Sequence, residues 1–164
     1  MQLPDPGLYR TTTPYPGREE DITANCLVYV GVPTNGGLPF VVRPGANRKN
    51  RWFWGEPTIP LRAVNWAESL VKLPSEGFYL LPEEISFDGG GRWLMNAIVQ
   101  LGYNEEGRGI LFIAEQHEAE EKNILSFSAS GRVIDDKLLK RLKWAPILPV
   151  DTDEQAVSAP KSSA

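Results

Sequence analysis

The chain has 164 residues, of which 41% are hydrophobic and 23% charged, and its formal net charge at pH 7 is −4. These values are typical of one globular domain that folds without disulfides or structural metals. The single cysteine excludes an intramolecular disulfide and a thiolate metal cluster, and it favours a reducing compartment. Because no apolar run is long enough to span a bilayer and the N-terminus lacks a signal-peptide pattern, we expect a cytoplasmic protein without a membrane role.

The first strands are predicted from local composition. Residues 1–25 contain four prolines and predict an extended arm, with a short strand at Leu8–Arg10. The run 26–32 is rich in β-branched and aromatic residues and predicts a strand. Asn35-Gly36 supplies the positive φ angles of a tight turn, and 38–43 predicts the returning strand. We therefore expect an antiparallel hairpin within the core sheet.

The rest of the chain alternates short apolar runs with glycine and proline. We expect a polar loop over 46–50, a strand over 51–54 and a helix over 61–73, where apolar residues recur at helical spacing. Further strands are predicted over 77–81, 84–87, 93–103, 109–114, 124–127 and 133–134. After Asp135, a second helix is predicted, whose apolar face is Leu138, Leu139 and Leu142.

These elements predict a mainly β fold (β-rich α+β). The expected architecture is a small antiparallel barrel or sandwich of about seven to eight short strands with one or two helices. The expected organisation is the arm over 1–25, a single β-rich globular domain over 26–150 and a disordered tail over 151–164. The tail offers too little apolar area to offset the entropy of ordering it.

Catalytic and metal-binding patterns are not evident in the sequence. The only histidine, His117, lies in the most acidic stretch, and Cys26 opens an apolar strand, where a cysteine usually behaves as a small buried hydrophobe. We therefore predict no catalytic residue, no metal ligand and no cofactor. An enzyme of unrecognised type is retained only as a third hypothesis.

Two further patterns favour structural interpretations. The glycine run 88–91 is followed by an apolar strand pattern and not by a helix, so it predicts a hairpin connection and not a phosphate-binding loop. Glu83 and Glu84 are adjacent, so in a strand they would point to opposite faces and not form an acid/base pair. The cations of the last helix are interpreted as its solvated face.

The segment 43–54 is the strongest candidate for binding. It places cations beside aromatic residues, a combination suited to protein interfaces and to single-stranded nucleic acid. In a strand, Trp52 and Trp54 share one face and Phe53 takes the other, so at least one aromatic is expected to face outward. The predicted binding residues are Arg43, Arg48, Lys49, Arg51, Trp52 and Trp54.

Charge is unevenly distributed along the chain. Residues 40–72 hold six basic and two acidic side chains, whereas 104–121 hold one basic and six acidic ones. These segments could meet in an assembly or pair within one molecule. The first functional hypothesis is therefore a non-enzymatic protein-interaction or structural module, self-associating in one version, with a protein partner or a homo-oligomer. The alternative is a small β-barrel that binds single-stranded nucleic acid through 43–54.

Overall fold

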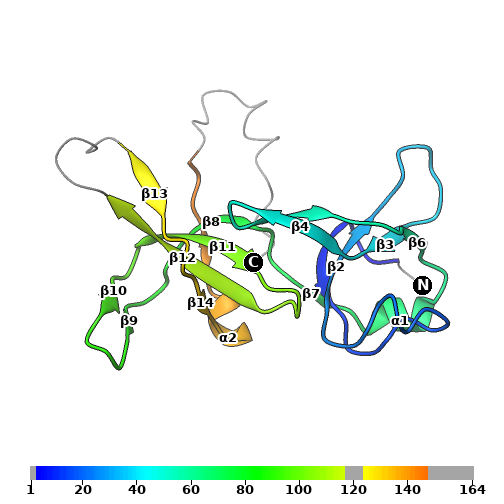
Figure 1. The fold of residues 1–164 in the computed structure, drawn as a ribbon, viewed down its shortest axis with the longest axis horizontal. Helices are drawn as coiled ribbons and strands as arrows, with labels where there is room; N and C mark the ends of the chain where they lie inside the picture. Colours follow the sequence, from blue (N-terminus) through cyan, green and yellow to red (C-terminus); the bar gives the residue numbers. More distant parts are fainter. Residues whose placement is uncertain (1–2, 117–123, 148–164) are drawn as a thin grey trace. The chain divides into compact units, whose positions relative to one another are not determined.

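The computed structural model describes residues 3–116 and 124–147 (Figure 1). We expected one globular domain over 26–150, and the described chain is divided more finely, into two compact units. Unit 1 holds the described residues up to Ser75 together with Tyr103–Arg108. Unit 2 holds Glu76–Gly102 and the described residues from Gly109 onward. His117 and the tail 151–164, for which we predicted disorder, lie outside the described residues.

Unit 1 is built on a five-stranded antiparallel sheet in the order β6-β3-β2-β1-β7. Its strands are β1 (Gly7–Arg10), β2 (Leu27–Gly31), β3 (Phe40–Val42), β6 (Ile59–Pro60) and β7 (Val71–Lys72). The expected hairpin is confirmed, because Tyr29 pairs with Val42 and Gly31 with Phe40. Gly36 in the connecting turn has φ +77°, a value that glycine adopts without steric cost.

The N-terminal segment belongs to the sheet and core of unit 1. The strand expected at Leu8–Arg10 is β1, which lies between β2 and β7. Further along the segment predicted as an arm, Tyr15 and Ile22 are buried in the core cluster. Thr11 holds this segment in place, since its hydroxyl donates to Thr23 O (2.7 Å) and accepts from Cys26 N (2.9 Å).

The first helix is shorter than the sequence predicts. We expected a helix over 61–73, and α1 covers only Val64–Glu68 before the chain extends into β7. Trp66 on this helix is buried, contacts the Tyr15 ring edge-on at 4.7 Å and donates to Thr13 O at 2.8 Å. The apolar residues that flank α1 lie in strands and loops and still contribute to the same core. Apolar residues can therefore recur at helical spacing over 61–73 although the helix itself is short.

Unit 2 is built on a six-stranded antiparallel sheet in the order β13-β12-β11-β8-β15, with β14 also paired to β12. The strands are β8 (Gly77–Leu80), β11 (Ile98–Tyr103), β12 (Gly109–Gln116), β13 (Leu125–Phe127), β14 (Arg132–Val133) and β15 (Lys143–Trp144). A separate hairpin, β9 (Ile85–Ser86) with β10 (Arg92–Trp93), and the helix α2 (Asp136–Leu139) complete the unit. The predicted strand over 93–103 is interrupted by a turn in which Asn96 has φ +65°.

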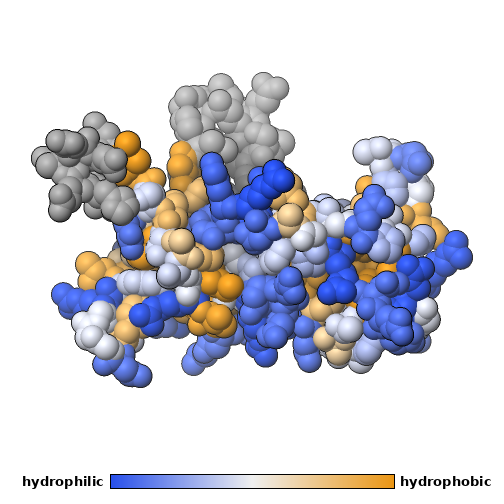
Figure 2. Space-filling model, in the orientation of Figure 1, coloured by the Kyte–Doolittle hydropathy of each residue, from blue (hydrophilic) through white to orange (hydrophobic). Residues whose placement is uncertain are grey.

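The mainly β prediction is confirmed. The described residues form four antiparallel sheets and two short helices. The strands are more numerous than the seven to eight expected, because several contain only two residues. Figure 2 shows hydrophilic residues over much of the visible surface, interrupted by apolar side chains. Within the described chain, neither helix has the length or the apolar character needed to cross a membrane.

Candidate functional site

The basic segment 43–54 forms a two-stranded antiparallel hairpin in unit 1. It consists of β4 (Pro44–Arg48) and β5 (Arg51–Trp54), joined by Lys49 and Asn50. Both turn residues have positive φ, +52° and +65°, which is the geometry of a type I′ turn. The prediction of a polar loop over 46–50 is therefore wrong for 46–48, which lie in β4, whereas Lys49 and Asn50 form the connection. The polar residues of β4 pair with β5 through their backbone groups, and the polarity of a side chain gives no information about such pairing.

A bulge near Gly45 interrupts the regular pairing of the hairpin. The register shifts between Pro44 and Ala46, so that Ala46 pairs with Phe53 while Pro44 pairs with Trp54. A Cβ on Gly45 would lie 3.0 Å from Gly55 Cα and 3.2 Å from Phe53 O. The two strands can approach this closely only because glycine occupies both sides of the contact.

The two tryptophans face the body of unit 1. Trp52 is half-buried and its indole Nε1 donates to Tyr103 O at 2.7 Å. Trp54 is also half-buried and stacks on Tyr29 of β2, with ring centroids 5.3 Å apart and an interplanar angle of 27°. These contacts attach the hairpin to the sheet through side chains on one face of β5.

The opposite face of the hairpin carries cations and one aromatic ring. Arg48 and Arg51 are cross-strand partners and both are exposed. Phe53, on the same face, is 51% exposed, and the Arg48 guanidinium lies 5.7 Å from the centre of its ring. Lys49 is exposed at the turn. We call Arg48, Lys49, Arg51 and Phe53 the outward face.

The structure separates the six predicted binding residues into three groups. Arg48, Lys49 and Arg51 lie on the exposed side of the hairpin. Trp52 and Trp54 anchor it. Arg43 precedes the hairpin and donates from Nη1 to Asp21 O at 3.0 Å, so it ties β4 to the segment before β2. Phe53 is not among the predicted residues, although the alternation of side chains along the strand places it on the face opposite to Trp52 and Trp54.

The local charge of the hairpin is strongly positive. No acidic residue occurs between Arg43 and Gly55 in the sequence. The acidic Glu105 and Glu106 are exposed in the segment 103–108 of the same unit. This segment is held by Leu27 N, which donates to Glu105 O at 2.7 Å, and by the Trp52 bond to Tyr103. Unit 1 thus carries both a basic hairpin and an exposed acidic turn.

Cys26 and the glycine run 88–91, which were also considered from the sequence, have structural roles. Cys26 is buried in the core of unit 1, as expected. The glycine run 88–91 connects β9 to β10, which confirms the hairpin connection. Across the described part of the chain, no three His, Cys, Asp or Glu side chains are grouped so that they could hold a metal ion.

Comparison with known proteins gives no identification. No family model, curated protein or solved structure matches the chain. Function therefore has to be argued from the geometry and chemistry of the sites themselves.

Proposed function

We propose that this chain is a non-enzymatic protein-interaction module whose outward face binds an acidic segment of a partner protein. The observation that supports the proposal is the gathering of exposed Arg48, Lys49, Arg51 and Phe53 on one side of an anchored hairpin. Exposed Glu105 and Glu106 make a second copy of the chain one partner of this kind.

The anchoring of the hairpin matters for affinity. A surface that is ordered before binding loses less conformational entropy when the partner arrives. The Trp52 bond to Tyr103 and the Trp54 stack on Tyr29 hold the backbone of β5, so only the outward side chains need to order. Arginine and aromatic residues are enriched at protein interfaces, and excess positive charge accelerates encounter with an acidic partner.

Single-stranded nucleic acid is the second candidate, favoured by one specific observation. Phe53 exposes half of its surface beside the Arg48 guanidinium, and an exposed ring beside a cation can stack a base while the cation contacts a phosphate. The net charge of −4 weighs against a general nucleic-acid binder, so we rank this candidate second.

The test compares two triple variants of the full chain. In the hairpin variant, Arg48, Lys49 and Arg51 are replaced by Ser. In the control variant, the exposed Arg62, Lys72 and Arg108 of unit 1 are replaced by Ser, which removes the same charge elsewhere. The probes are a fluorescent glutamate-rich peptide and a fluorescent oligo-dT strand, titrated by anisotropy over a range of salt concentrations.

We expect the hairpin variant, but not the control, to lose peptide binding while both retain the wild-type melting temperature. Oligo-dT that binds more tightly than the peptide, with a salt slope reduced by about 2 in the hairpin variant, would instead support the nucleic-acid candidate, since each single-strand phosphate contact contributes about 0.7. Equal binding by both variants, or no binding of either probe to the wild type, would reject the outward face as a binding surface.

Phe53 provides an independent test. Phe53→Ser should weaken the binding of whichever probe the wild type prefers. Leu38→Ser is the matched control, because Leu38 is 54% exposed in the β2–β3 connection of the same unit. An equal loss in both variants would show that the ring of Phe53 has no specific role.

A further inference from the structure

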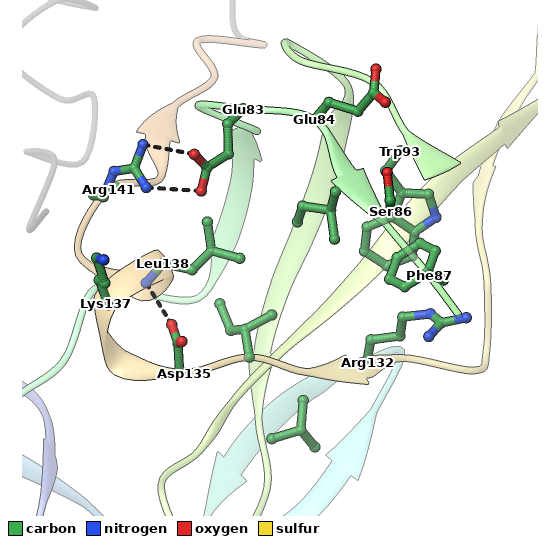
Figure 3. A pocket seen from close by; sticks show the side chains of 13 residues that line it. Glu83, Glu84, Ser86, Phe87, Trp93, Arg132, Asp135, Lys137, Leu138 and Arg141 are labelled. Atoms are coloured by element: carbon green, nitrogen blue, oxygen red, sulfur yellow. Dashed lines mark hydrogen bonds and ion pairs between the residues drawn. The ribbon is translucent and has the colours of Figure 1, made fainter. Parts of the chain in front are cut away.

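Unit 2 contains a pocket of about 800 Å³, and all of its lining residues belong to that unit. It lies between the β9–β10 hairpin and the segment that runs from β14 into α2 (Figure 3). Half-buried Ile85, Ile134 and Leu138 give it apolar walls. Phe87, Trp93 and Arg132 lie on one side of the pocket in Figure 3, and Glu83 and Arg141 lie on the other.

The Arg132 guanidinium is held by an aromatic pair. Its central carbon lies 3.6 Å from the centre of the Phe87 ring and 5.9 Å from that of Trp93. The two rings themselves pack edge-to-face at 5.0 Å. A guanidinium so close above a ring is engaged through its flat face, which leaves the N–H groups at its edge available to an acceptor.

The backbone also fixes Arg132. The residue belongs to β14 and pairs with Leu111 of β12. Stacking and pairing together hold the guanidinium of Arg132, which lines the pocket, in a defined position. Within the described residues, the Arg132 side chain has no hydrogen bond or ion pair, and the two rings are its cation–π partners.

Each acidic side chain of the pocket has a partner other than Arg132. Glu83 accepts two hydrogen bonds from Arg141, at 2.8 and 3.2 Å, and this contact raises the pKa of Arg141. Asp135 accepts from Leu138 N at 2.8 Å and thereby caps α2. Glu84 Oε1 lies 3.8 Å from Arg92 Nη1, which makes an ion pair. Arg132 and Lys137 therefore line the pocket without a carboxylate partner among the described residues, and of the two only Arg132 is held by aromatic rings.

We propose that this pocket binds a small carboxylic acid with an apolar or aromatic body, and that Arg132 holds its carboxylate. A planar guanidinium edge matches two carboxylate oxygens, and the apolar walls accommodate the body of the ligand. The lining includes three acidic side chains, Glu83, Glu84 and Asp135, and three basic ones, Arg132, Lys137 and Arg141. This balance favours a monoanion over a doubly charged phosphate.

The first experiment uses the wild-type full chain and three probes: 3-phenylpropanoate, its neutral amide, and inorganic phosphate. Binding is followed by NMR through the Arg132 side-chain and Trp93 indole N–H signals. We expect the acid to bind roughly tenfold or more tightly than the amide, because a charge-assisted hydrogen-bond pair is lost in the amide. Equal affinity for acid and amide, or phosphate binding tighter than the acid, would overturn the proposal.

The second experiment changes the guanidinium. Arg132→Gln and Arg132→Lys should each weaken 3-phenylpropanoate binding about tenfold or more, because the lysine retains the charge but not the two-pronged geometry. Lys140→Gln is the control, since Lys140 is exposed on unit 2 and does not line the pocket. Unchanged affinity in folded Arg132 variants would overturn the assignment. If Arg132→Gln fails to fold, Arg132→Lys and the wild-type comparison of acid with amide decide the question.

Discussion

The two units bury their apolar residues to different extents. In unit 1, β2 is buried on both faces, and a contiguous cluster that includes Tyr15, Ile22 and Trp66 fills the core. Most of the buried apolar side chains among the described residues belong to this unit. Unit 2 has a smaller set of described core residues and a longer list of large exposed apolar ones: Leu94, Met95, Ile98, Ile124, Leu125, Val133 and Ile147.

This difference bears on the two proposed sites. The outward face of unit 1 lies on the β4–β5 hairpin, which two tryptophans attach to the unit and which contributes no residue to the core cluster. The pocket of unit 2 instead uses residues that the unit leaves half-buried, such as Phe87, Trp93 and Leu138. A ligand in the pocket would cover part of this surface, so the site and the packing of unit 2 are linked, whereas in unit 1 they are separate.

The largest expected effect is on the core of unit 1. Val30 in β2 is fully buried, so Val30→Asp places an unpaired charge in that core. We expect a loss of about 4 kcal/mol or more, enough to unfold or aggregate the protein in thermal and denaturant unfolding. Val32→Asp is the control, because Val32 lies two residues along the chain and is 48% exposed. Wild-type melting of Val30→Asp would show that β2 is not the central strand of this core.

The sequence predicts best those elements that depend on residues close together in the chain. The β2–β3 hairpin followed from a β-branched run and Asn35-Gly36, both of which act within a few residues. For the hairpin β4–β5, the sequence predicts the strand over 51–54 but not its partner strand, because pairing depends on residues across the turn. The burial of Tyr15 and Ile22 depends on contacts with distant segments, and a proline-rich stretch gives no local signal of it.

The candidate sites show the same limit. Alternation along 51–54 indicates that at least one aromatic side chain faces outward. The predicted binding residues include Trp52 and Trp54, because tryptophan is common at interfaces, but both attach the hairpin to unit 1. The pocket was not predicted at all. Its lining comes from residues 83–87, 93, 132–135, 137, 138 and 141, and only tertiary structure brings Arg132 onto the ring of Phe87.

The second prediction concerns how tightly β14 packs in unit 2. A Cβ on Gly131 would lie 2.2 Å from Ile110 Cγ2 and 2.6 Å from a ring carbon of Phe112. Gly131→Ala should therefore displace the start of β14 and cost about 1–3 kcal/mol in denaturant unfolding, as overpacking does. It should also weaken the binding of 3-phenylpropanoate, because Arg132 is the next residue.

Gly89→Ala is the matched control for this substitution. Gly89 lies in the β9–β10 connection of the same unit, and a Cβ there would meet nothing within 4 Å. We expect its stability to remain within about half a kcal/mol of wild type. Equal stability of the two variants would mean that β14 has room to move, and the fixed orientation of Arg132 would then lose its support.

The third prediction compares the two units directly by amide hydrogen exchange. Leu27 in unit 1 and Leu81 in unit 2 have fully buried side chains, and their amides donate to Glu105 O (2.7 Å) and Ala97 O (3.1 Å). Since the residue type, burial and bonding are matched, a difference in protection reports the local stability of each unit.

Because unit 2 leaves more of its described apolar surface exposed, we expect the Leu81 amide to exchange roughly tenfold or more faster than that of Leu27, after correction for intrinsic rates. Saturating 3-phenylpropanoate should slow Leu81 and leave Leu27 unchanged, because a ligand protects the unit that binds it. Protection of Leu81 equal to that of Leu27 would contradict the comparison, and it would show that the exposed apolar residues of unit 2 do not weaken its core.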